Sequence, residues 1–183
     1  MIGQPLLLVL FALASSEKNK ADTADLSKKI KAGDHRAFQA FYDAHFDGLL
    51  YFLMSKNTTR EAAKDIIQKA FIYIWEKRGG IDPDKSLKAY IFRIAYTRML
   101  NYHRDNKKFD VAEAVPEQST ELTPEDEARK SQLEEAIDWA IADMPEKRGE
   151  VFTLCFLEEF TYREAAEALD VTRKTVENHM GMA

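Results

Sequence analysis

An acidic stretch from residue 109 to residue 127 interrupts a chain that otherwise has a helical pattern. It contains seven acidic residues, no basic residue, and the two prolines Pro116 and Pro124. Proline breaks helices, and structureless runs of this length are uncommon inside a compact domain. The stretch therefore predicts a linker between two domains, with a long surface loop inside one domain as the alternative.

The two parts that flank this stretch both predict helices. Their apolar residues recur at helical spacing, and the whole chain has only 7 Gly and 5 Pro among 183 residues. We therefore predict an all-α fold, in which two small helical domains are joined by an acidic flexible linker. The expected divisions are an apolar N-terminal extension (1–21), a first domain (22–108), the linker (109–127) and a second domain (128–183).

The first domain is expected to contain four helices, over about 22–31, 35–54, 58–78 and 87–107. The third begins with Thr58-Thr59-Arg60-Glu61, which has the form of an N-terminal capping box. Its apolar stripe is predicted to be buried and its polar stripe exposed. The buried stripe comprises Ala63, Ile67, Ala70, Phe71 and Ile74, and the polar stripe comprises Asp65, Gln68, Lys69 and Glu76.

The fourth helix carries a basic surface. Residues 85–108 contain seven basic residues and one acidic residue, which is typical of a surface that binds a polyanion. Helical spacing places Ile91, Ala95, Met99 and Tyr102 on a core face, and Arg93, Thr97, Asn101 and Arg104 nearly opposite. The second set can contact phosphates and bases, and Tyr90, Phe92 and Tyr96 are aromatic side chains of the kind that stack on unpaired bases. On these residues alone, a nucleic-acid surface and a solvated helix face with aromatics in the core are both open.

The second domain ends in a predicted helix-turn-helix. Thr161 to Glu164 forms a second capping box, Asp170-Val171 makes the turn, and Thr172 caps a helix that begins at Arg173. Small residues permit close packing of the two helices, and apolar residues supply the core between them. The small residues are Ala165 and Ala166, and the apolar ones are Leu169, Val171 and Val176. An ordinary helical hairpin is the alternative.

The sequence contains few groups suited to catalysis. The single cysteine, Cys155, allows no internal disulfide and fits a cytoplasmic location. There is no HExxH or GxxxxGK motif, and the four histidines show no metal-binding spacing. We expect no catalytic residues, no metal and no cofactor.

The chain starts with an apolar run, Leu6–Ala14, that raises the question of export. The run is shorter than the ~20 residues that span a bilayer, and no Lys or Arg precedes it. We expect no stable membrane insertion and interpret the run as a misplaced start or a local apolar extension. A secreted protein is the alternative.

Three stretches together resemble bacterial sigma factors of the extracytoplasmic-function (ECF) type, within the sigma-70 family. DIIQKAFIYIWEKR is similar to region 2.2, and SLKAYIFRIAYTRMLNYHRDNKK is similar to regions 2.3 and 2.4. DMPEKRGEVFTLCFLEEFTYREAAEALDVTRKTVENH is similar to region 4. The resemblance implies a polymerase subunit that directs promoter recognition, with core RNA polymerase, promoter DNA and an anti-sigma factor as partners.

The resemblance also implies a role for each part of the chain. The residues implied to dock on the β′ clamp of the polymerase are Asp65, Gln68 and Phe71. Those implied to bind the −10 element are Tyr90, Arg93, Thr97, Asn101, Arg104, Lys107 and Lys108, with the loop 79–86 receiving a flipped base. Region 4 would contact the β flap and place Arg173, Lys174, Thr175, Asn178 and His179 in the −35 major groove.

Three departures from the family pattern bear on these roles. Thr97 stands where Asn is usual, and Asp170 stands where Gly is common in the turn. Asp tolerates the left-handed conformation better than most residues, so the turn is expected to form. The chain ends soon after His179, so a truncated recognition helix is expected. A helix-turn-helix regulator that is not a polymerase subunit is the alternative function, but it leaves the 65–78 and 86–108 stretches unexplained.

Overall fold

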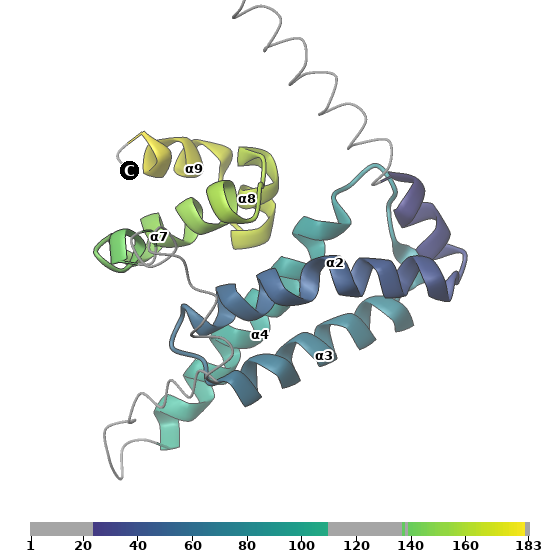
Figure 1. Ribbon diagram of the computed structural model, residues 1–183, viewed down its shortest axis with the longest axis horizontal. Helices are drawn as coiled ribbons and strands as arrows, with labels where there is room; N and C mark the ends of the chain where they lie inside the picture. Colours follow the sequence, from purple (N-terminus) through teal and green to yellow (C-terminus); the bar gives the residue numbers. More distant parts are fainter. Residues whose placement is uncertain (1–23, 110–136, 138, 182–183) are drawn as a thin grey trace, which may run out of the picture.

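The computed structural model describes residues 24–109, 137 and 139–181. These residues form helices joined by turns, in two groups that lie side by side (Figure 1). The all-α, two-domain prediction is confirmed. The predicted linker, apart from Phe109, and the N-terminal extension lie outside the described residues.

The first domain begins with a helix over residues 24–31, followed by α2 (His35–Met54), α3 (Arg60–Glu76), the short 3₁₀ turn η1 (Arg78–Gly80) and α4 (Leu87–Phe109). Between the first helix and α2, Gly33 takes a positive φ of 89° that suits glycine. Asp34 then caps α2, accepting hydrogen bonds from the amides of Arg36 and Ala37 at 2.8 and 3.1 Å. The predicted helices of this domain are confirmed to within a few residues.

The predicted capping box at Thr58 is wrong. The N-cap of α3 is Thr59, whose hydroxyl accepts from the amide of Ala62, whereas Thr58 is buried. The Thr58 hydroxyl is instead 3.0 Å from Nε2 of His103 on α4. By residue type, either of the two adjacent threonines could cap the helix. Thr58 is buried and contacts His103 of α4, so Thr59 is the cap.

The second domain contains a helical stretch over residues 139–142, α7 (Glu146–Phe152), the π-helical turn η3 (Thr153–Leu157), α8 (Tyr162–Leu169) and α9 (Arg173–Met180). The amphipathic pattern of KRGEVFTLCFLEEF (147–160) predicts a single helix where α7 and η3 are found. The amide of Glu158 bonds the carbonyl of Thr153, and the amide of Phe160 bonds that of Leu154. These bonds close the helix in a wide last turn and direct Phe160 toward the first domain.

The helix-turn-helix is confirmed by its caps and turn. Thr161 and Glu164 form both hydrogen bonds of the capping box, Thr172 caps α9, and Asp170 takes the left-handed conformation at φ 56°. The small and apolar residues predicted between the helices are buried, with the exception of Val171, which is 37% exposed. Val171 lies in the turn itself, where its amide bonds the carbonyl of Ala166.

The two domains share one hydrophobic cluster. Buried side chains of the helix 24–31 and of α2, α3, α4, α7, α8, α9 and η3 belong to it. The ring of Phe92 on α4 lies between Phe52 of α2 at 5.9 Å and Phe160 of the second domain at 4.9 Å. Nothing in the sequence pattern predicted this contact between domains. Among the described residues, no helix is both long and apolar enough to cross a membrane.

We predict that His45 makes stability depend on pH. Burial, followed by the nearby Lys88 charge, lowers the pKa of His45 from 6.5 to about 4. Between these two values the unfolded chain binds a proton that the folded chain does not, so the free energy of unfolding falls as pH falls from 6.5 to 4. The loss is at most roughly 3 kcal/mol.

His45→Gln removes this titration, so its stability should fall less than that of the wild type over the same pH range. Urea unfolding at several pH values measures this, with exposed His35→Gln as the control. Equal pH profiles for wild type and His45→Gln would contradict the assignment.

Candidate nucleic-acid interface

Helix α4 presents a row of exposed polar and basic side chains. Arg93, Thr97, Asn101 and Arg104 are all exposed, whereas the opposite face is buried against α2 and α3. The opposite face consists of Ile91, Ala95 and Met99, with Tyr102 partly buried. The two faces predicted from helical spacing are therefore found. Lys107 and Lys108 extend the same helix toward its C-terminal end, and their side chains lie outside the described part of the chain.

Tyr90 and Tyr73 border a pocket at the first turn of α4. The pocket holds about 770 Å³ between the end of α3, η1, the loop that follows it and the start of α4, and Glu167 of α8 also lines it. The two tyrosines are each more than a third exposed. Burial, followed by the hydrogen bond to Tyr73, raises the pKa of Tyr90. Two aromatic rings beside backbone polar groups are suited to hold a nucleobase.

The loop that forms one wall of this pocket is held at both ends. Lys31 donates a 2.8 Å hydrogen bond to the carbonyl of Ile81, and the Asp82 carboxylate accepts from the amide of Asp84 at 3.1 Å. Ser86 then caps α4 by accepting from the amide of Ala89 at 3.2 Å. The pocket wall is therefore anchored before any ligand arrives.

Two of the three aromatic residues considered for stacking on bases are buried, which decides between the two interpretations that the sequence left open for them. Phe92 is 1% exposed and Tyr96 is 5% exposed. They form a third face of α4, which is neither the core face nor the polar row, and the second domain packs on it. Helical spacing separates such a face from its neighbours but does not show what covers it. Of these three residues of α4, only Tyr90 remains available for stacking.

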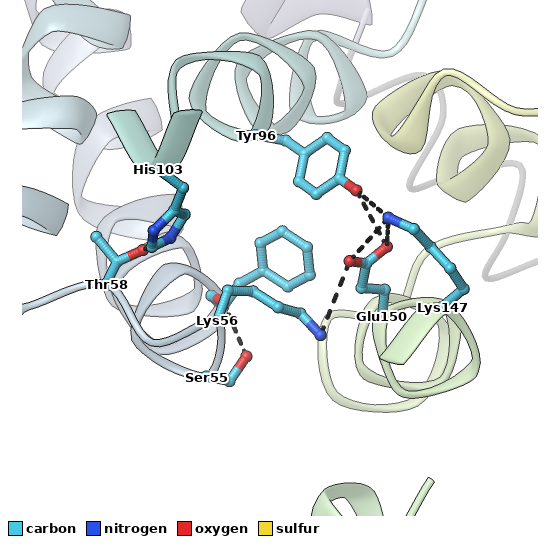
Figure 2. A network of polar contacts seen from close by, with 8 residues as sticks. Ser55, Lys56, Thr58, Tyr96, His103, Lys147 and Glu150 are labelled. Atoms are coloured by element: carbon cyan, nitrogen blue, oxygen red, sulfur yellow. Dashed lines mark hydrogen bonds and ion pairs between the residues drawn. The ribbon is translucent and has the colours of Figure 1, made fainter. Parts of the chain in front are cut away.

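Tyr96 takes part in a polar network between the domains (Figure 2). Lys147 of α7 donates to the Tyr96 hydroxyl at 2.7 Å, and that hydroxyl is 3.2 Å from the buried carboxylate of Glu150. Lys147 also contacts this carboxylate at 3.1 Å, and Lys56 approaches it at 3.9 Å from the end of α2. Burial raises the pKa of Tyr96. The hydrogen bond from Lys147 lowers this pKa and the Glu150 charge raises it, and the net shift is upward. The network neutralises a carboxylate that would otherwise be costly to bury.

Helix α9 presents its predicted contact residues to the solvent. Arg173, Lys174 and Asn178 are exposed, and Thr175 and His179 are partly exposed, while Val176 is buried beneath them. Arg173 also bonds Glu177 one turn along at 2.9 Å. The turn at Asp170 and the cap at Thr172 therefore orient one open helix face that can enter a groove.

Helix α3 presents a polar face at the other side of the first domain. Asp65 and Gln68 are exposed, and Asp65 pairs with Lys69 on the next turn at 2.5 Å. Phe71 is only 3% exposed, and its ring packs against Phe38, Phe41 and Tyr42. Its side chain therefore supports the helix from the core and is not available to a docking partner.

The described histidines lie apart from one another. His35 packs on Trp75, His45 on Phe41, and His103 bonds Thr58. Within residues 24–109 and 139–181, no three His, Cys, Asp or Glu side chains are placed to hold a metal ion.

Comparisons with known families agree with the two domains. Residues 41–109 match the family described as Sigma-70 region 2, and residues 134–183 match the family described as Sigma-70, region 4. These ranges cover more than half of the chain. The gap between the two matches, residues 110–133, contains nearly all of the acidic stretch.

Individual relatives are more distant but match over most of their length. The ECF RNA polymerase sigma factor SigM of Bacillus subtilis is 21% identical over 72% of this chain and 80% of its own. The ECF RNA polymerase sigma-E factor of Haemophilus influenzae is 23% identical over 85% of this chain and 87% of its own.

Solved structures share the fold. CnrH, in a complex with the cytosolic domain of CnrY, matches with a TM-score of 0.62 and 21% identity, over 88% of this chain and 91% of CnrH. RpoE of Bartonella quintana, in a complex with the anti-sigma factor NepR, matches with a TM-score of 0.54 and 19% identity, over 79% of this chain and 90% of that one.

We predict that the two charged partners of the network differ in their effect on stability. Glu150→Ala leaves Lys56 without its partner in a nearly buried place, so it should lower the free energy of unfolding by about 3 kcal/mol. Lys147→Ala should cost less than about 1 kcal/mol, because the Lys147 side chain is 58% exposed. Urea unfolding of both variants measures the difference, and equal costs would contradict the described geometry.

Proposed function

The chain belongs to the sigma-70 family, as an ECF sigma factor that binds core RNA polymerase and directs promoter recognition, and we propose how its surfaces divide this work. The observation that carries the proposal is that one chain joins a region 2 domain with an exposed polar row on α4 to a region 4 helix-turn-helix. The region 2 match also accounts for the α3 and α4 surfaces, which a simple helix-turn-helix regulator left unexplained.

The polar row of α4 is proposed to hold the non-template strand of the −10 element. Arg93 and Arg104, with Lys107 and Lys108, supply charge for the phosphates, while Thr97 and Asn101 supply hydrogen bonds for the bases. Thr97 has one hydroxyl where the family resemblance implies the amide of Asn, so it can make fewer directional bonds than Asn. Asn101 is then the main candidate for base discrimination.

The pocket beside Tyr73 and Tyr90 is proposed to receive a base that leaves the stack. Residues of the loop 79–86 line the pocket. The family resemblance implies that this same loop receives a flipped base, and this agreement supports the role. Opening a promoter requires unpaired bases to be held outside the duplex, and ring stacking compensates part of the energy of unstacking.

Region 4 is proposed to read the −35 element. Helix α9 would enter the major groove with Arg173, Lys174, Thr175, Asn178 and His179, and α8 would cross the backbone. Reading two separated elements at once requires two domains, which the chain provides.

The partners follow from the same assignment. Asp65 and Gln68 on α3 are proposed to meet the β′ clamp of core polymerase, and region 4 is proposed to meet the β flap. Two solved relatives are held in complexes, one of them with a protein named as an anti-sigma factor, which supports an anti-sigma factor as a partner here. As a recognition subunit working with polymerase, the chain would act in the cytoplasm and leave catalysis to the core enzyme.

Transcription in vitro tests the proposal as a whole. Core RNA polymerase supplied with this chain should start transcripts at discrete sites in a library of genomic DNA from its host, and core polymerase alone should not. The absence of chain-dependent start sites, with binding to polymerase also absent, would contradict the proposed function.

We predict that Asp65 serves binding and contributes little to the fold. Its side chain is 55% exposed, and its pair with Lys69 is a surface pair on one helix, worth less than about 0.5 kcal/mol. Asp65→Ala should therefore weaken binding to core polymerase about tenfold while the melting temperature stays within a few degrees. Lys64→Ala, at the exposed neighbouring position, is the control. A large loss of melting temperature with intact binding would show that the residue is structural.

We predict that Asn101 and Arg104 affect promoter binding in different ways. Arg104→Ala removes a phosphate contact, so it should weaken binding about equally for all sequences and reduce the salt slope by about one unit. Asn101→Ala should change which −10 bases are preferred, by about 1–3 kcal/mol at one position. Binding to a panel of −10 single strands at several salt concentrations measures both. The opposite pattern would reverse the roles.

A further inference from the structure

The loop 79–86 begins with two residues that their surroundings do not hold. A Cβ added at Gly79 or Gly80 would meet no atom within 4 Å, so the space around both is open. Glycine also has more backbone freedom than any other residue. The shape of the pocket wall therefore depends on what holds the residues that follow, Ile81 and Asp82, and both of these line the pocket.

Ile81 is held by three contacts. Its side chain is buried in the core of the first domain, and its amide donates to the carbonyl of Arg78 at 3.1 Å. Its carbonyl accepts the 2.8 Å hydrogen bond from Nζ of Lys31. This third contact comes from the helix 24–31, drawn in purple in Figure 1, which lies 50 residues earlier in the chain.

Lys31 lies in the last turn of its helix, which makes its choice of acceptor informative. A lysine near a helix C-terminus can bond the last carbonyls of that same helix. The acceptor here belongs to another element, although Lys31 is an exposed residue with access to water. A charged donor forms a stronger hydrogen bond than a neutral one. The bond therefore fixes the peptide group between Ile81 and Asp82, which is part of the pocket wall.

The same segment contacts the start of the loop at a second place. The turn at Gly33 follows the helix 24–31, and a Cβ on Gly33 would lie 3.6 Å from Nε of Arg78. Arg78 donates to the carbonyl of Trp75 at 2.8 Å, and its guanidinium lies 4.5 Å from the centre of that ring. His35 packs on the same ring, with 4.5 Å between the ring centres. Residues 24–35 therefore brace both the end of α3 and the loop.

This bracing segment lies outside the family match. The match to Sigma-70 region 2 begins at residue 41, ten residues after Lys31. Roles that follow from the matched residues therefore leave the contact between Lys31 and Ile81 unassigned.

We propose that Lys31 is a positioning residue of the base pocket, which holds the Ile81 carbonyl from behind and so keeps the loop 79–86 in the conformation that receives a base. The inference rests on the proposed base-receiving role of this pocket. Lys31 is not among the residues that line the pocket, so it acts through Ile81 and touches no base. When fewer chains have the pocket formed, the apparent affinity for the strand falls by the same factor.

The substitution Lys31→Met tests this role. It removes the charge and the donor but keeps an unbranched side chain that suits a helix. Lys28→Met is the matched control, because Lys28 is exposed on the same helix and the substitution removes the same charge. Lys31→Arg keeps a charged donor and should restore function. The melting temperature of all three variants should stay within a few degrees of the wild type.

The measurement is fluorescence anisotropy of DNA bound by the full chain together with core RNA polymerase. The probe is the labelled non-template strand of the −10 element from a start site found in the transcription assay. A second set of probes carries an abasic nucleotide at one position at a time. The position at which loss of the base weakens wild-type binding most identifies the base that occupies the pocket.

Lys31→Met should weaken binding of the intact strand about fivefold, but binding of the strand that lacks the pocket base less than about twofold. Lys28→Met should leave both affinities within about twofold of the wild type, and Lys31→Arg should recover most of the loss. Equal losses on the two strands, with a salt slope smaller by about one unit, would show that Lys31 contacts a phosphate directly and would overturn the proposal. No loss on either strand would also overturn it.

A second measurement needs no DNA. The amides of Asp84 and Lys85 both donate to Asp82 inside the loop, so their hydrogen exchange reports whether the loop keeps its shape. Exchange at both should be several-fold faster in Lys31→Met than in Lys28→Met, and equal rates would overturn the proposal. Failure of the proposed function would show differently, as no binding to core RNA polymerase and no chain-dependent start site in the wild type.

Discussion

The insertion of Phe92 between Phe52 and Phe160 is the contact on which the arrangement of the two domains depends. It makes one hydrophobic cluster out of two small cores, each of which has few helices to bury its apolar surface. The polar network around Glu150 lies on the same side of α4, where the buried carboxylate is compensated by Lys147 and Tyr96. Without the aromatic contact, the polar contacts of Glu150, Lys88 and Arg93 would remain as links between the domains.

Helix α4 serves three purposes because its surface is divided among three faces. The face with Ile91, Ala95 and Met99 holds the first domain together, and the face with Phe92 and Tyr96 receives the second domain. The remaining face, with Arg93, Asn101 and Arg104, stays exposed and is the one proposed to bind nucleic acid.

The sequence predicted the helices and their caps well, because both depend on local chemistry. The box at Thr161, the turn at Asp170 and the cap at Thr172 were all identified from residue type and spacing. What the sequence left wrong or open concerns burial that only tertiary contacts decide. Thr58 was predicted to be a cap but bonds His103. Phe92 and Tyr96 were left open between base stacking and the core, and they lie beneath the second domain. Helical periodicity shows that a side chain leaves the core face, but it does not show which distant segment covers it.

A direct measurement of the distance between the domains tests the central claim, that the insertion of Phe92 holds the two domains together. Donor and acceptor dyes at Ala40 on α2 and Arg163 on α8, both exposed, would report this distance in a Cys155→Ser background. Energy transfer should be efficient in the chain with native Phe92 and should fall when Phe92→Ala is introduced. Equal transfer with and without Phe92→Ala would contradict the account.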